Sequence, residues 1–389
     1  FDIVIGNPPY IDSETMTKNM ALLRNIYSKK FSCSKGNWDI FVVFIEQAFN
    51  LLCCNGIFSF IIPNKLIAAK YALELRKFLG KKTIVEIRDY SRIDVFKNAD
   101  VYPITVVIRN SQAQNIDNTS FTIMKEILKI EQSLIVKANL LISETYWDIF
   151  FQKKVIFEIV RKMETLKSKS FEIKVLGAAT VNEAYEIKKI IHESLNQKNE
   201  LKFINTGTID PYVQKWGIEN CSYIKGKYLQ PVVKESDLKK ISETRFKQSK
   251  SSKIIVAGMS CRFEAVLDLE GEFIAGKSTT IILGNGQYLK FLISIINSKI
   301  ASFWLNVKFN SMKMSGGYLN VGTNELSHLP IPPATPAQQQ AIIALVDKIL
   351  AAKKQDSSID TTALESKIDE FVYDLYGLTE EEKDIIRNN

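Results

Sequence analysis

Two hydrophobic periods alternate over the first 110 residues and predict an α/β fold. Short, mostly apolar runs are typical of buried strands, and longer segments with apolar residues three or four apart are typical of amphipathic helices. Their alternation indicates a sheet covered by helices on both faces. The predicted strands are residues 1–5, 57–62, 83–87 and 104–108, and the predicted helices are 39–54, with Asp39 as its cap, and 65–79.

After residue 110 the pattern changes. Residues 111–120 are polar and predict a connection, and residues 146–166 have the spacing of one amphipathic helix. From about 171 to 333, short strands, turns and a few helices follow one another, which favours an α+β arrangement. The predicted elements there are antiparallel strands within 253–283, a helix over 288–305 and, after a proline-rich break at 330–336, two helices over 337–352 and 361–376.

Charge divides the chain into a basic and an acidic part. The chain has 51 Lys and Arg against 43 Asp and Glu, a net charge of +8. Residues 336–389 contain 6 basic and 11 acidic side chains, which leaves a net charge of +13 on residues 1–335. A basic excess fits a nucleic-acid partner without requiring one, and this division places the expected contact on the first 335 residues.

Composition excludes several classes of protein. With 46% hydrophobic and 24% charged residues, the chain is typical of a globular protein. No apolar run reaches the roughly 20 residues of a membrane helix, so we expect no membrane association. The five scattered cysteines lack metal-ligand spacing, which favours a reduced, cytoplasmic protein without a metal site. Because the chain begins at Phe1 inside a predicted strand, we expect a fragment of a longer protein.

The sharpest chemical signal is the turn Asn7-Pro8-Pro9-Tyr10, directly after the first predicted strand. In open α/β sheets, ligands bind beyond the carboxyl ends of the strands, which is where this turn lies. Two successive prolines fix the backbone and keep the turn rigid. The simpler interpretation is that these four residues form only a turn, but the preceding apolar strand supplies the context that a functional motif requires.

The residue types in this turn suit methylation of an adenine amino group. The lone pair of that nitrogen is delocalised into the ring and must be localised before the nitrogen can attack. The side-chain oxygen of Asn7 and the carbonyl of Pro8 are two acceptors for the amino hydrogens, and this is electrostatic preorganisation without a titrating base. Tyr10 offers a ring on which an extruded base can stack, worth roughly 1–3 kcal/mol.

Residues 1–10 (FDIVIGNPPY) resemble the catalytic motif of adenine-specific amino-group DNA methyltransferases. The similarity continues through residues 35–41, 56–64, 94–96 and 101–109. The resemblance implies that residues 1–110 form the C-terminal half of a Rossmann-like methyltransferase sheet. It also implies an aromatic side chain that packs against the flipped adenine. Phe96 is the best match and Tyr102 the competitor, and each could equally be an aromatic residue of the core.

The C-terminal part resembles the target-recognition domain fused to such methyltransferases in restriction–modification enzymes. The resemblance rests on residues 288–304, the pair Gly316-Gly317 before Tyr318, and residues 326–333, and residues 337–374 resemble the end of that module. The expected fold is α/β followed by α+β. The expected domains are 1–110, the half of the catalytic domain; 111–170, a connection and linking helix; 171–335, target recognition; and 336–389, acidic helices.

Basic and aromatic residues in the turn-rich part of 171–335 are candidate DNA contacts. Each lysine could instead be a solvated surface charge, and Arg262 could read a guanine or lie along apolar surface. His192 and His328 lack the partners of a zinc site and are interpreted as structural. The candidates are Arg262, Lys277, Lys308, Lys313 and Tyr318, and Lys225 and Lys227 lie in the same turn-rich group.

The resemblance implies S-adenosylmethionine as the methyl donor and double-stranded DNA as the partner. In the family the main cofactor motif lies upstream of the Asn-Pro-Pro-Tyr turn, so we expect it before residue 1. The leading hypothesis is a sequence-specific adenine DNA methyltransferase of a restriction–modification system. The alternatives are an inactive DNA-binding specificity fragment and, because that family shares the motif, a protein glutamine methyltransferase. Neither the recognised DNA sequence nor the oligomeric state follows from the sequence.

Overall fold

A computed structural model describes residues 1–96, 102–143, 146–166, 174–195 and 198–388. The chain forms two compact units. The first comprises Phe1–Glu158 with Val307–Met312, and the second comprises Ile159–Asn306 with Lys313–Asn389. This grouping differs from the expected domain limits. Residues 111–170 were expected to form a connection and a linking helix, but residues 111–158 pack with the first unit.

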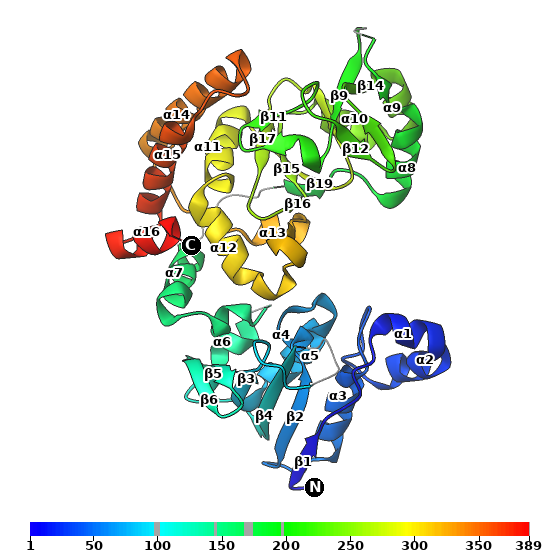
Figure 1. Ribbon diagram of the computed structural model, residues 1–389, viewed down its shortest axis with the longest axis vertical. Coiled ribbons are helices and arrows are strands. Elements are labelled where there is room, and N and C mark those ends of the chain that lie inside the picture. Colours follow the sequence, from blue (N-terminus) through cyan, green and yellow to red (C-terminus); the bar gives the residue numbers. More distant parts are fainter. Residues whose placement is uncertain (97–101, 144–145, 167–173, 196–197, 389) are drawn as a thin grey trace. The chain divides into compact units, whose positions relative to one another are not determined.

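The first unit contains a six-stranded mixed sheet (Figure 1). The strand order is β1-β2-β4-β3-β5-β6; β1 pairs with β2 and β3 with β5 in parallel, and the other pairs are antiparallel. The α/β prediction for this region is therefore confirmed, with two more strands than predicted. The strands are β1 Ile3–Gly6, β2 Ile57–Pro63, β3 Lys82–Asp89, β4 Pro103–Gln112, β5 Asn118–Glu126 and β6 Lys129–Lys137.

The strands predicted as wholly buried do not have two buried faces. On β1, Ile3 and Ile5 are exposed, contrary to the prediction, whereas β2 has one buried and one half-buried face. On β2, Phe58 and Ile62 are fully buried and lie opposite Ile108 and Ile104 of β4, which are equally buried. The alternate positions, such as Ile61, are only half-buried. Because the residues on the half-buried face are also apolar, the sequence of the strand is an unbroken apolar run. Such a run predicts burial on both faces, which is more than the structure shows.

Shorter helical elements replace two of the long helices that the pattern predicted, 65–79 and 146–166. The segment 65–79 is broken at Ala69, whose backbone is extended with ψ 134°. The segment 146–166 contains a 3₁₀ turn and a separate helix. The helical elements are α1 Ser13–Asn19, α2 Ala21–Lys30, α3 Phe41–Leu51, α4 Lys65–Ala68, η1 Lys70–Ala72, α5 Leu73–Gly80, α6 Ala138–Ser143, η2 Asp148–Phe151 and α7 Lys154–Thr165.

The second unit contains two four-stranded sheets, ordered β18-β9-β14-β8 and β17-β15-β19-β7. The antiparallel strands predicted within 253–283 are confirmed as β17, β15 and β19. The strands are β7 Lys174–Gly177, β8 His192–Glu193, β9 Glu200–Ile204, β10 Ile209–Asp210, β11 Val213–Gln214, β12 Cys221–Tyr223, β13 Gly226–Tyr228, β14 Pro231–Lys234, β15 Lys253–Ala257, β16 Met259–Ser260, β17 Ala265–Asp268, β18 Phe273–Ala275, β19 Thr279–Leu283 and β20 Leu319–Asn320.

The remaining helices lie in the second unit, except that Val307–Met312 belongs to the first. The predicted helix 288–305 is divided at Asn297, which ends the first of its two parts. The two predicted C-terminal helices are confirmed and a third follows them. The helical elements are α8 Val181–Ile190, η3 Thr206–Thr208, α9 Glu235–Ile241, α10 Glu243–Lys250, α11 Gly286–Ile296, α12 Lys299–Lys308, η4 Asn310–Met312, η5 Ser315–Gly317, α13 Thr323–His328, α14 Pro336–Gln355, α15 Thr362–Leu375 and α16 Glu380–Arg387.

Two separate cores hold the sheets of the second unit. One contains Phe203 and Val233, and the other contains Ile255 and Ile281. Among the residues described above, no helix combines the length and apolar character that crossing a bilayer would require.

Candidate active site

The candidate active site is the turn that leaves the sheet after β1. Because β1 and β2 run parallel, with Gly6 opposite Phe60, their carboxyl ends lie at the same edge of the sheet. A Cβ atom on Gly6 would lie only 2.7 Å from Cε1 of Phe60. Glycine at this position therefore lets the aromatic ring of β2 pack against the strand immediately before the turn.

The two predicted acceptors of the turn have no partner among the residues that the structure describes. The Asn7 side chain is exposed and makes no hydrogen bond to any residue that the structure describes. Pro8 is buried, and its carbonyl accepts no hydrogen bond from the same set of residues. Acceptors that the fold does not use remain open to a ligand.

Tyr10 and Phe96 meet edge to face beside this turn. Their ring centroids are 6.0 Å apart and the ring planes are inclined by 89°. The Tyr10 hydroxyl is buried without a hydrogen-bond partner among the described residues, and its burial raises the pKa of Tyr10 to about 12. The phenol is therefore neutral near pH 7, so Tyr10 offers a ring and a neutral hydroxyl.

Tyr102, the competitor of Phe96, lies differently. Its side chain is 63% exposed, and its backbone carbonyl accepts a hydrogen bond of 2.8 Å from Asn64 N–H. The structure thus brings Phe96, rather than Tyr102, into ring contact with Tyr10. The residues between them, 97–101, lie outside the described part of the chain.

Asp39 does not cap the helix that follows it, so that prediction is wrong. The cap position of α3 is Ile40, and no side chain accepts a hydrogen bond there. The buried carboxylate of Asp39 instead accepts three hydrogen bonds from other segments. These come from Ser13 N–H at 2.9 Å, Lys65 Nζ at 2.9 Å and the Tyr71 hydroxyl at 2.8 Å.

The loop that carries Asp39 is held on its other side by Arg24 of α2. The Arg24 guanidinium lies 4.7 Å from the ring centroid of the buried Trp38. It also donates hydrogen bonds to the carbonyls of Trp38 at 2.9 Å and Gly36 at 3.0 Å. A cation above an indole ring and two charge-assisted hydrogen bonds fix the loop against α2.

Sequence reasoning missed Arg24, Lys65 and Tyr71. The nearest signal was Asp39 itself, a carboxylate between the apolar residues Trp38 and Ile40, since a buried carboxylate needs donors. The sequence does not identify those donors. They come from helices whose ends cannot be predicted from the hydrophobic pattern.

Most of the predicted DNA contacts lie on the surface, with one exception. Lys277 and Lys313 are exposed, and Tyr318 is 47% exposed. The Arg262 side chain is 59% exposed, and its Nε lies 3.3 Å from Oε1 of Glu264. Lys308 is only 7% exposed, so it does not present its charge to solvent, contrary to the prediction.

The weaker candidates Lys225 and Lys227 lie on the hairpin of β12 and β13. The two turn residues, Ile224 and Lys225, have φ values of 39° and 60°, the left-handed pair that a two-residue hairpin requires. Lys227 lies opposite Ser222 on the exposed face. Asn205 links this hairpin to the loop of Lys277, since it donates to the Ser222 carbonyl at 3.1 Å and accepts from the Ser278 hydroxyl at 2.5 Å.

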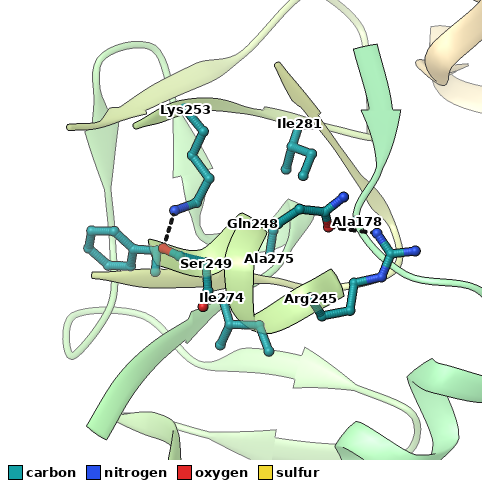
Figure 2. Close-up of a pocket in the computed structure, with 9 residues that line it drawn as sticks. Ala178, Arg245, Gln248, Ser249, Lys253, Ile274, Ala275 and Ile281 are labelled. Carbon is teal, nitrogen blue, oxygen red and sulfur yellow. Dashed lines mark hydrogen bonds between the residues drawn. The ribbon is translucent and has the colours of Figure 1, made fainter. Parts of the chain in front are cut away.

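A small cavity in the second unit contains charged residues but does not offer them to a ligand. Figure 2 shows Arg245 directed toward Gln248, and Lys253 toward Ser249. The Arg245–Gln248 hydrogen bond is 2.6 Å, and the Lys253 ammonium donates to the Ser249 carbonyl at 2.6 Å and pairs with Asp268. Arg245 and Lys253 are therefore bonded to other residues of the protein and stabilise the fold. Within the described ranges, no group of three or more His, Cys, Asp or Glu side chains could hold a metal ion.

Comparison with known proteins tests the resemblance. Residues 1–96 match the model of the Eco57I restriction-modification methylase family. The predicted resemblance is confirmed. The Type II restriction enzyme and methyltransferase RM.Eco57I of Escherichia coli is 26% identical over 226 residues, which cover 55% of this chain and 22% of the relative. The Type II methyltransferase M.XhoI of Xanthomonas vasicola is 20% identical over 433 aligned positions, which cover 99% of this chain and 76% of the relative.

Among solved structures, the chain is similar to the Type IIL restriction-modification enzyme MmeI, which was solved in complex with DNA. The TM-score is 0.52 at 12% sequence identity, over 98% of this chain and 55% of that one. This likeness shows the fold alone. The chain spans about a fifth of RM.Eco57I and about half of MmeI, so it corresponds to part of these larger enzymes.

Proposed function

We propose that this chain carries the target-base side of an adenine-specific DNA methyltransferase from a restriction–modification system. The observation that carries the proposal is the pair of open acceptors, Asn7 and Pro8, beside the rings of Tyr10 and Phe96. The matches to restriction-modification methylases over residues 1–96 support it. The adenine target and the methyl donor are part of the proposal.

The chemistry follows from the two acceptors. One amino hydrogen of the extruded adenine is bound by the Asn7 side-chain oxygen and the other by the Pro8 carbonyl, which favours a pyramidal amino group whose lone pair is localised on nitrogen. Once the nitrogen carries the methyl group, it releases one proton to solvent. Stabilisation by fixed dipoles needs no titrating base. The edge-to-face rings of Tyr10 and Phe96 provide the apolar surface for the base.

S-adenosylmethionine, when bound, would supply the electrophilic methyl group. The carboxylates close to the turn do not fit its ribose hydroxyls: Asp12 caps α1, and both oxygens of Asp39 are occupied. We therefore assign no residue of this chain to the ribose of the cofactor. The turn is assigned only to the base that receives the methyl group.

The test of this function is Asn7→Ala in the full-length protein. We expect methyl transfer to duplex DNA to fall by about 10²-fold or more, the cost of losing one preorganised hydrogen-bonding group. DNA affinity should remain within a few fold, because the Asn7 side chain makes no hydrogen bond within the described part of the chain. Methylation at the normal rate would contradict the proposal, and methylation of a glutamine side chain instead of DNA would select the protein-directed alternative.

We further propose that the second unit binds the DNA backbone. Its exposed basic candidates are Arg262, Lys277 and Lys313, together with the hairpin residues Lys225 and Lys227. Lys225, Lys227 and Lys277 have no ion-pair or hydrogen-bond partner for their ammonium groups among the described residues, so their charge is available to phosphates. Tyr318 is an exposed ring close to Lys313 in sequence and can stack on or bond to the backbone.

Salt dependence of affinity tests this assignment. Replacing Lys225, Lys227 and Lys277 by Gln should weaken duplex binding and reduce the slope of log affinity against log salt by about 0.9 for each phosphate that is no longer neutralised. The matched control replaces three exposed lysines of α14 and α15 in the acidic region, Lys348, Lys354 and Lys367, and should leave the slope unchanged. Equal effects of the two triple variants would refute the assignment. DNA binding without any methylation would instead favour a specificity module.

A further inference from the structure

We propose that Asp39 is a positioning residue for the catalytic turn, which it holds through the segment that follows Tyr10. The inference rests on the proposed function and deepens it, since it assigns a role outside the Asn7–Tyr10 motif. Asp39 touches neither the proposed base nor the acceptors. It acts through Ser13, with Lys65 and Tyr71 as supports.

One carboxylate joins three elements of the first unit. Oδ1 of Asp39 accepts the Ser13 N–H at the start of α1, at 2.9 Å. Oδ2 accepts the Lys65 ammonium of α4 at 2.9 Å and the Tyr71 hydroxyl of η1 at 2.8 Å. The Asp39 side chain is 8% exposed, so its carboxylate is largely shielded from water, although its partner Lys65 is 51% exposed.

The break in the predicted helix 65–79 makes this geometry possible. Positions 65 and 71 are six residues apart, which on a continuous α-helix places them about 240° apart around the axis, on different faces. Because the backbone leaves the helix at Ala69, both side chains reach one carboxylate oxygen. The buried Arg76 stabilises the break, since its Nη1 donates to the carbonyls of Leu66 at 2.9 Å and Ala69 at 3.0 Å.

The segment after Tyr10 is held at three successive residues. The Ile11 carbonyl accepts the Ile40 N–H at 3.0 Å, the Asp12 side chain caps α1, and the Ser13 N–H bonds to Asp39. The other end of the turn is fixed by the pairing of β1 with β2. The turn is thus held at both ends, and none of the described residues occupies the Asn7 side chain, which is the arrangement that a preorganised acceptor requires.

The carboxylate cannot be replaced by its amide without loss. Asp39 accepts on both oxygens, whereas an asparagine has one accepting oxygen and a donating NH₂ group. In Asp39→Asn the NH₂ group faces either Ser13 N–H or the pair of Lys65 and Tyr71, and a donor then opposes a donor. An NH₂ group that faces Ser13 opposes one donor, whereas one that faces Lys65 and Tyr71 opposes two, so the first orientation is favoured. The variant should therefore release the segment at Ser13 while it keeps the volume of the side chain.

The experiment compares Asp39→Asn with Glu46→Gln in the full-length protein. Glu46 is a matched control on α3, a half-buried carboxylate that accepts from Ser32 N–H, the Ser32 hydroxyl and Cys33 N–H, at the opposite end of the segment 31–40 from Asp39. We expect Asp39→Asn to lower single-turnover methyl transfer by about 10- to 100-fold, as a misplacement near 1 Å does. KM for DNA should change less than threefold. Glu46→Gln should transfer at close to the wild-type rate.

Hydrogen exchange supplies a readout that does not depend on activity. In Asp39→Asn, amides of residues 10–15 should exchange at least tenfold faster, and those of β2 at the wild-type rate. Unchanged exchange at 10–15, or wild-type methyl transfer, would overturn the proposal, as would equal acceleration throughout the first unit. If Asp39→Asn does not fold, Tyr71→Phe, which removes one neutral donor, should show the same pattern at about 3- to 10-fold. Absence of methyl transfer in the wild type would refute the proposed function instead, and exchange would still decide whether Asp39 holds the segment.

Discussion

Each unit contains a buried aspartate that binds a lysine and backbone amides, but the surroundings of the two lysines differ. In the second unit, Asp268 and Lys253 approach to 2.5 Å, and their side chains are 2% and 1% exposed. In the first, Asp39 is 8% exposed, but its partner Lys65 is 51% exposed. The comparison therefore sets an enclosed ion pair against one that opens to solvent.

The enclosed pair is fully bonded. Besides Asp268, the Lys253 ammonium donates to the carbonyls of Ser249 and Ser251. Asp268 accepts from the amides of Gly271, Glu272 and Phe273 at 2.9–3.1 Å. Burial lowers the pKa of Lys253, and Asp268 opposes that shift. Such a pair fixes the local backbone, and either charge alone would be left in a site without solvent.

The pair of Asp39 and Lys65, which is open to solvent, leads to the opposite conclusion about stability. Water can solvate the Lys65 ammonium, so Asp39 would retain Ser13, Tyr71 and some solvent if Lys65 were removed. Its contribution to the free energy of unfolding should be small, although its geometry decides where residues 11–13 lie. A site can therefore be important for positioning without being important for stability, and three changes test this distinction.

The largest effect is expected for Lys253→Met. The substitution keeps an apolar stem but leaves the Asp268 charge buried without a cation, which should lower the free energy of unfolding by about 3–5 kcal/mol. The measurement is urea unfolding of the protein, followed for the transition of the second unit.

The control is Lys250→Met. Lys250 pairs with Glu235 at 3.0 Å, but their side chains are 43% and 26% exposed, so this change should cost less than about 1 kcal/mol. A Lys253→Met variant that is no less stable than this control would contradict the account of the enclosed pair.

The second effect concerns Asp369, a buried carboxyl without a lysine partner among the described side chains. Its Oδ1 accepts a hydrogen bond of 2.8 Å from the backbone N–H of Lys299, not from the ammonium group. Burial raises the pKa of Asp369 to about 6. Because the folded state then binds a proton that the unfolded state has released, the free energy of unfolding falls as pH rises from about 4 to 6. At 1.36 kcal/mol per pH unit, the full difference is roughly 3 kcal/mol.

Asp369→Asn should remove this pH dependence, since the amide keeps an acceptor for the Lys299 N–H and carries no charge. The comparison is the difference in unfolding free energy between wild type and variant, measured by urea at pH 4.5 and pH 7. The variant should gain stability relative to the wild type at the higher pH. A difference that does not vary with pH would show that Asp369 ionises normally.

Local chemistry could be predicted from the sequence, whereas contacts between distant segments could not. The strand, the rigid turn and its resemblance followed from ten consecutive residues, and the structure places the turn at the carboxyl end of β1. The start of β5 was missed because 111–120 is polar, although β4 extends to Gln112 and β5 begins at Asn118. No strand was predicted for 121–145, which contains the rest of β5 and all of β6.

The supports of the turn show why the remainder could not be predicted. The spacing of apolar residues over 65–79 fits one helix, and nothing in it marks the break at Ala69. The break is stabilised by Arg76 from the next helix and brings Lys65 and Tyr71 to Asp39. Tertiary hydrogen bonds of this kind override helical spacing, and a single sequence gives no sign of which donor a buried carboxylate will find.

The smallest effect is expected for Lys65→Met, and it sharpens the comparison most. The pair is half open to solvent, so its loss should lower the free energy of unfolding by about 1 kcal/mol or less, several times below the cost at Lys253. The same urea titration measures both variants, followed here for the transition of the first unit. A cost equal to that of Lys253→Met would mean that exposure does not separate the two aspartates, and that Asp39 is a stabilising pair rather than a positioning one. A small loss of stability accompanied by faster hydrogen exchange at residues 10–15 would mean that the Asp39 site positions the turn and contributes little to the free energy of unfolding.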